Sequence, residues 1–145
     1  MKGNLEDQKG TSAVEFALVL PILAILVFGI IEFSLALYDK AMITNASREG
    51  ARAGIVYRTD PGSGDYLPLS DAEIANIVNQ YLRNYLITFG GSTNATTAVI
   101  RNGSGVGSDL KVSVGYTYAF LVLPNLITNL TGGINLSADT VMRME

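Results

Sequence analysis

The stretch Gly10-Thr-Ser-Ala-Val-Glu-Phe-Ala-Leu-Val-Leu-Pro21 decides the fold of this chain, because it opens a long apolar segment with a single carboxylate at the entrance. The residues from Phe16 to Ile31 carry no charge, and Glu32 is the first interruption. Glu15 therefore stands at the mouth of a predicted membrane helix, where a charge is costly unless another group pairs with it.

The predicted membrane helix runs from Phe16 to Tyr38. As an α-helix this segment is about 34 Å long, which is enough to cross a hydrocarbon core of about 30 Å with some tilt. Glu15 and Glu32 lie about 25 Å apart along the helix axis. We therefore expect each carboxylate near one face of the membrane rather than at its centre.

A cleaved secretory signal peptide is the alternative interpretation of the same segment. Ser34-Leu-Ala36 offers a cleavage site with small residues at the required positions. The apolar region is longer than the usual 7–15 residues of a signal peptide, and the helical pattern continues without a break past Ala36. We therefore favour a helix that is retained in the mature protein.

The composition argues against several classes of function. The chain has 145 residues, a net charge of −3, no cysteine and no histidine. One compact domain and a membrane segment fit this length, and no basic patch is visible that would bind nucleic acid. Without histidine or cysteine no usual nucleophile–base pair can form. We expect no enzyme, no catalytic residue, no cofactor and no metal site. Asp60, Asp65 and Asp71 match no standard calcium loop, so a solvated acidic loop is favoured.

The pattern around the apolar segment predicts a leader and one long helix. Residues 1–10 form a polar leader that we expect to be unstructured, and Thr11–Tyr57 is expected to be one helix. Past the membrane, Ala46, Gly50 and Gly54 recur every four residues on one face. Such a stripe lets another element approach closely. We favour packing against the chain's own domain over a seam between two copies.

The rest of the chain predicts a small domain of helix and sheet. Thr59–Leu69 has the composition of a turn or loop. Ser70-Asp-Ala-Glu73 matches a capping box, and apolar residues at helical spacing predict a helix over Asp71–Ile87 that ends before Gly90.

Strands are predicted in the last third of the chain. They are expected over Ala98–Arg101, Leu110–Leu123 and Ile134–Met144, with a flexible hairpin loop over residues 102–109. Residues 123–130 are expected to form a short helix or a surface loop. The predicted fold class is α+β, with a short antiparallel sheet packed against the helices.

Three motifs and the C-terminal tail resemble the TadE-like family, the pseudopilins or minor pilins of tight-adherence systems. The motifs are the opening stretch, Phe28-Gly-Ile-Ile-Glu-Phe33 and Asn45-Ala-Ser-Arg-Glu-Gly-Ala-Arg52, and the tail is residues 138–145. The resemblance covers roughly residues 10–58 and the tail. Residues 59–133 carry no signature of the family.

The resemblance implies roles for individual residues. A prepilin peptidase would cut after Gly10 and make Thr11 the new N-terminus. Glu15 of one subunit would then neutralise the Thr11 amine of a neighbour, although a pair within one chain competes because the two residues lie one turn apart. Glu32 belongs to the second motif, and it is expected to contact Lys40 indirectly, a partner subunit, or water.

As a whole, the resemblance implies a pilin-like assembly subunit anchored in the cytoplasmic membrane by a single span. The leader (residues 1–10) would be cytoplasmic, the long helix would occupy residues 11–58, and an α+β domain (residues 59–145) would lie outside and could enter an extracellular filament. Its partners would be the prepilin peptidase, other pilin-like subunits, the assembly machinery and the membrane, with no nucleic acid. The distribution of Lys and Arg around the span leans the other way. A single-span protein whose outer domain binds a partner or envelope component without filament assembly is the alternative.

Overall fold

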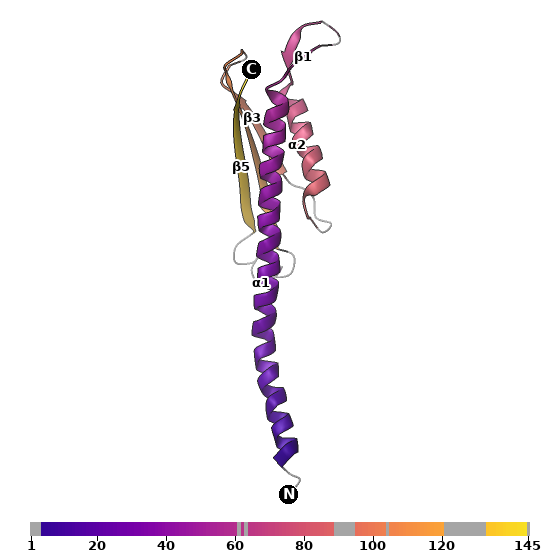
Figure 1. Ribbon diagram of the computed structural model, residues 1–145, viewed down its shortest axis with the longest axis vertical. Coiled ribbons are helices and arrows are strands. Elements are labelled where there is room, and N and C mark those ends of the chain that lie inside the picture. Colours follow the sequence, from indigo (N-terminus) through magenta and orange to yellow (C-terminus); the bar gives the residue numbers. More distant parts are fainter. Residues whose placement is uncertain are drawn as a thin grey trace.

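The computed structural model describes residues 4–60, 62, 64–88, 95–103, 105–120 and 133–144, with side chains described from Gly10 onward. A long helix, α1 (Asn4–Gly54), runs the length of the molecule, and its upper part packs against a small domain (Figure 1). The domain contains a second helix, α2 (Asp71–Tyr85), a two-stranded hairpin and a three-stranded antiparallel sheet. The predicted α+β class is confirmed.

Helix α1 begins earlier and ends earlier than predicted. The expectation of an unstructured leader was wrong for the described part, because the helix already includes Asn4 to Gly10. Leu, Glu, Gln and Lys in this stretch are good helix formers, and no proline separates them from the apolar segment. At the other end α1 stops at Gly54, a residue type that is common where helices end. Tyr57, which was expected in the helix, begins a strand instead.

The three-stranded sheet has β4 (Asp109–Tyr118) at its centre, between β3 (Ala95–Arg101) and β5 (Ile134–Arg143). Alternate residues of β4 are buried, as a strand with one face on the core requires. The side chains that β4 contributes to the core are Leu110, Val112, Val114, Tyr116 and Tyr118. This face of the sheet packs against α1 and α2, so the core lies between two helices and one sheet.

The predicted strands and hairpin loop correspond closely to β3, β4 and β5. β3 starts three residues earlier than expected, and β4 ends at Tyr118 within its predicted span. Asn102 N–H donates to the Asp109 carbonyl over 3.0 Å and closes the loop between β3 and β4. Gly107 in this loop has a φ of 89°, which favours glycine. The predicted segment over residues 123–130 and the predicted glycine stop after α2 lie outside the described residues.

A hairpin occupies the segment that was predicted to be only a turn or loop. Its strands are β1 (Tyr57–Thr59) and β2 (Tyr66–Pro68), which pair antiparallel. The turn between them is closed by a bond from Asp60 N–H to the Asp65 carbonyl over 2.8 Å. Strands of three residues are too short to show alternation, so the sequence displayed only the turn.

Helix α2 starts where the capping box predicted. The Ser70 hydroxyl accepts a bond from Glu73 N–H, and the Glu73 carboxylate accepts from Ser70 N–H over 2.8 Å. The helix ends at Tyr85 rather than Ile87, because Leu86 has an extended backbone with ψ of 139°.

Candidate functional site at the membrane helix and its junction with the domain

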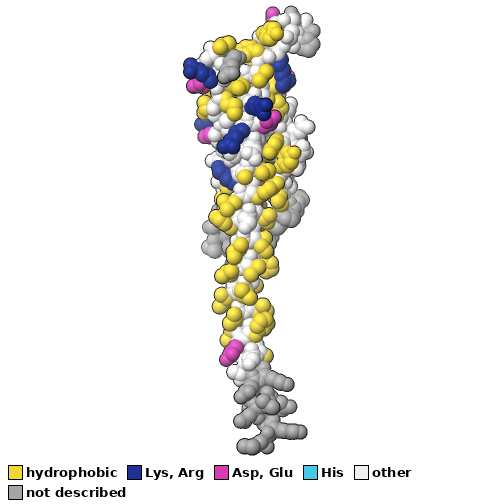
Figure 2. Space-filling model, viewed as in Figure 1, with side chains coloured by type: hydrophobic (Ala, Val, Ile, Leu, Met, Phe, Trp, Pro, Cys, Tyr) yellow, Lys and Arg dark blue, Asp and Glu magenta, His cyan; other side chains and the backbone are white. Residues whose placement is uncertain are grey.

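The lower part of α1 stands free of the domain and exposes an apolar surface. Figure 2 shows hydrophobic side chains along the narrow stem of the molecule, below a domain whose surface carries the basic side chains. From Phe16 to Ile31 nearly every side chain is exposed. Among the described residues, α1 is the one helix with the length and composition to cross a membrane.

The predicted processing and pairing residues lie together near the free end of this stem. Gly10, Thr11 and Glu15 are all exposed, and nothing lies within 4 Å of the position that a Cβ on Gly10 would take. The two described ion pairs, Arg101–Asp71 and Lys111–Asp139, both lie in the domain and do not include Glu15.

Glu32 has a partner that the sequence did not indicate. The Tyr118 hydroxyl donates a hydrogen bond of 2.6 Å to Glu32 Oε1, and both residues are only 3% exposed. Tyr118 is the last residue of β4, so this bond fastens the lower end of the sheet to α1. Burial, followed by the bond to Glu32, raises the pKa of Tyr118, which therefore remains a proton donor.

Asp39 is a second buried carboxylate on the same side of α1, and the sequence analysis did not single it out. Its Oδ1 accepts a bond from Ile87 N–H over 3.1 Å, whereas Oδ2 has no hydrogen-bond partner. Burial raises the pKa of Asp39, and the Ile87 bond lowers it to a smaller extent. Glu32, Ala36, Asp39 and Ile43 are all buried and follow the spacing of one helical face. That spacing was the signal available in the sequence.

The small-residue stripe faces the chain's own domain, as predicted. A Cβ on Gly50 would lie 2.5 Å from Val78 Cγ2, and one on Gly54 would lie 2.5 Å from side-chain atoms of Ile74 and Leu110. Glycine therefore lets α1 approach α2 and β4 closely. Polar contacts add to this packing between α1 and β5: Lys40 donates to the Ser137 carbonyl, and the hydroxyls of Ser47 and Thr140 are 2.7 Å apart.

The acidic residues near the hairpin do not gather into a metal site. Asp71 pairs with Arg101 at 2.7 Å, and the Asp60 and Asp65 backbones close the hairpin turn. Within the described parts of the chain, no group of three His, Cys, Asp or Glu side chains is placed to hold a metal.

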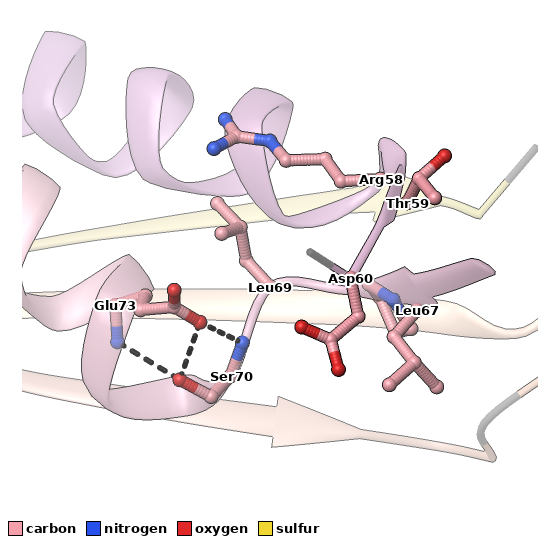
Figure 3. A pocket seen from close by; sticks show the side chains of 8 residues that line it. Arg58, Thr59, Asp60, Leu67, Leu69, Ser70 and Glu73 are labelled. Atoms are coloured by element: carbon pink, nitrogen blue, oxygen red, sulfur yellow. Dashed lines mark hydrogen bonds between the residues drawn. The ribbon is translucent and has the colours of Figure 1, made fainter. Parts of the chain in front are cut away.

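An open cleft of about 460 Å³ lies between the hairpin and the start of α2. Figure 3 shows Arg58 and Asp60 on the hairpin side, and Glu73 turned back to Ser70 on the other. The Glu73 carboxylate accepts the hydrogen bonds from Ser70 that cap α2, and these bonds lower its pKa. The Ser70 hydroxyl also donates to Glu73 Oε2 over 2.7 Å, so both side chains in this cleft take part in the cap of α2.

These features fit a single-pass membrane protein with one apolar helix, whose upper part contributes to the core of a small α+β domain. Residues 10–52 match the family model described as TadE-like protein, which confirms the predicted resemblance. The matched segment lies within α1 and includes Glu15 and Glu32. This match supports a pilin-like protein associated with a tight-adherence pilus. No curated protein and no solved structure matches the chain. The resemblance of residues 138–145 lies beyond the matched range and stays a prediction.

Proposed function

We propose that the protein is a pilin-like assembly subunit, a pseudopilin or minor pilin, of a tight-adherence pilus or secretion system, and that a prepilin peptidase processes it. It is held in the cytoplasmic membrane by α1, with the α+β domain outside, before it joins or primes an extracellular filament. The observation that carries the proposal is that the family match begins at Gly10, at the free end of an exposed apolar stem.

The dimensions of the stem support membrane anchoring. From Gly10 to Ile31 a helix is about 32 Å long, close to the thickness of a hydrocarbon core. Glu32 follows at once, and it is covered by Tyr118 rather than exposed to lipid. The domain therefore begins where the span can end.

A cut after Ala36, as a signal peptidase would make, fits this structure poorly. Ala36 is part of the hydrophobic core, and Glu32 is bonded to Tyr118. Removal of residues 1–36 would take both side chains away from the domain. This favours retention of the helix.

Cleavage after Gly10 requires the helix to open locally, since α1 is continuous from Asn4. Glycine weakens a helix by about 1 kcal/mol relative to alanine, so Gly10 lowers the cost of opening. The mature protein should begin at Thr11, and Gly10→Leu should leave the precursor uncut. Gly29→Leu is the matched control, because Gly29 lies in the same stem and also has open space around its Cβ position.

Mass spectrometry of the protein from cells that hold the cognate peptidase tests this. An intact Met1 chain, or a start at Leu37, would refute processing. An intact chain would then be a single-span membrane protein that acts without filament assembly, whereas a start at Leu37 would mean that the apolar segment is a removed signal peptide.

Glu15 is proposed to pair with the Thr11 amine of a neighbouring subunit. Glu15→Ala should insert and be processed normally, because a charge near the lipid is removed, while assembly into surface filaments should be lost. Glu15→Gln, which keeps the size and removes the charge, should behave alike.

Membrane content, cleavage and crosslinks to pilus components measure these steps separately. Normal assembly of Glu15→Ala would mean that the carboxylate is only favoured by the helix dipole. Loss of cleavage would place Glu15 in the recognition site of the peptidase instead.

A further inference from the structure

The part of the α2 surface that borders α1 carries aromatic rings and amides, whereas the charged residues of α2 lie outside it. A groove of about 300 Å³ lies where this face meets α1, and Glu49 is the one charged residue among those that line it. The residues of α2 that line the groove recur at helical spacing and are Ile77, Gln80, Tyr81, Asn84 and Tyr85.

The two tyrosines form a fixed aromatic platform in this groove. The ring centroids of Tyr81 and Tyr85 lie 4.6 Å apart, and the ring planes are tilted by 41°. Tyr81 is half-buried and packs against the core, whereas Tyr85 is 49% exposed. Contact with one another and with the core limits the motion of the rings, so a ligand loses little side-chain entropy by binding to them.

Polar side chains that can donate or accept hydrogen bonds flank the two tyrosine rings. The Gln80 and Asn84 amides each offer both donors and acceptors, and the oxygens of the Glu49 side chain offer acceptors. The described lining contains no Lys or Arg, so nothing there attracts an anion. These side chains suit an uncharged ligand with many hydroxyl groups, which the amides and the carboxylate can bond. The C–H groups of such a ligand can lie against the negative face of an aromatic ring.

The size of the groove is compatible with a small ligand. Its volume of about 300 Å³ lies at the lower end of the range of small-ligand sites, about 300–1,000 Å³. We propose that this groove binds neutral carbohydrate, with one sugar ring on Tyr85 and its hydroxyls bonded to Asn84, Gln80 and Glu49. This binding is independent of the proposed assembly role, because the groove lies on the domain and not on the free stem.

The test uses the full chain in a zwitterionic detergent without a sugar head group, since glycoside detergents would compete. Chitohexaose and maltohexaose are the neutral probes, and a hyaluronan hexasaccharide is the anionic one. Isothermal titration calorimetry measures affinity, and the chemical shifts of ring-labelled tyrosines locate the site. We expect at least one neutral probe to bind and the hyaluronan fragment not to bind.

Tyr85→Ala should weaken binding by at least about tenfold and leave the thermal unfolding midpoint within a few degrees of wild type. Tyr66→Ala is the matched control, because Tyr66 is 72% exposed on the hairpin, away from the groove, and it should bind like wild type. Absence of binding to both neutral probes, preference for hyaluronan, or equal weakening by both variants would overturn the proposal. So would self-association of the chain that Tyr85→Ala abolishes, because the groove would then be occupied by a second copy.

Discussion

Replacement of Tyr118 by phenylalanine tests whether the bond to Glu32 holds the lower end of the sheet on α1. Tyr118→Phe keeps the ring, and so keeps its edge-on contact with Phe120 at 6.0 Å between centroids. It removes only the hydroxyl that donates to Glu32 Oε1 over 2.6 Å. The variant therefore isolates one buried hydrogen bond without opening a large cavity.

The expected loss follows from the charge and burial of the acceptor. A hydrogen bond to a charged group contributes about 1.5–3 kcal/mol, and both residues are nearly inaccessible to water that could replace it. For a domain of 60–100 residues this corresponds to a fall in the unfolding midpoint of roughly 6–24 °C. Thermal unfolding of the full chain in micelles, followed by near-ultraviolet circular dichroism, measures it.

Tyr66→Phe is the control, since its hydroxyl belongs to an exposed side chain and its loss should cost less than about 0.5 kcal/mol. A double-mutant cycle with Glu32→Gln should give a coupling energy within the range of about 0.5–3 kcal/mol seen for residues in contact. A Tyr118→Phe variant as stable as Tyr66→Phe would refute the reasoning.

The raised pKa of Tyr118 makes the pH dependence of stability a second test of the Tyr118 side chain's role. The folded tyrosine keeps its proton above pH 10, where the unfolded one begins to lose it. Its contribution to stability is therefore complete below about pH 10 and declines as the pH rises further. Tyr118→Phe should remove this part of the alkaline loss of stability.

Two more substitutions test the packing and charge of α1. Gly50→Ala should lower the free energy of unfolding by about 1–3 kcal/mol, because the added Cβ would overpack against Val78. Gly29→Ala is the control: it has open space around it and should change that free energy by less than about 0.5 kcal/mol. Denaturant titration compares the two, and equal stability would contradict close packing at Gly50. Burial raises the pKa of Asp39 in the folded protein above its usual 3.8. Wild type should therefore lose stability relative to Asp39→Asn as the pH rises from about 4 through that raised pKa. Unfolding curves measured at several pH values test this, and equal shifts for both proteins would contradict it.

Features that depend on neighbouring residues could be predicted from the sequence. The capping box at Ser70 and Glu73 is a local pattern, and it placed the start of α2 correctly. Apolar residues alternate along β4, and this local pattern indicated a strand there because the side-chain period of a strand is fixed. The stretch that begins at Gly10 was likewise visible as a local pattern, and the family match begins at this glycine.

Features that depend on distant contacts could not be predicted in this way. Glu32 and Tyr118 lie 86 residues apart in the chain, and no local pattern links a glutamate in an apolar helix to the end of a strand. The orphaned oxygen of Asp39 is equally a product of tertiary packing. The early start of α1 was missed for a different reason. A polar composition alone does not distinguish a helix from an unstructured leader.

The anchor and the domain share one helix, and this has a mechanical consequence. Ile43, Ala46 and Ala51 of α1 are completely buried in the core of the domain, so no flexible linker separates the core from the membrane stem. The predicted division after residue 58 is therefore a division along the sequence, while in space the upper part of α1 belongs to the domain. A rotation or axial shift of the stem is passed directly to the sheet through the close contacts at Gly50 and Gly54 and the bond at Glu32. Any partner that fixes the register of the stem, as proposed for Glu15, would thereby also fix which face of the domain points outward.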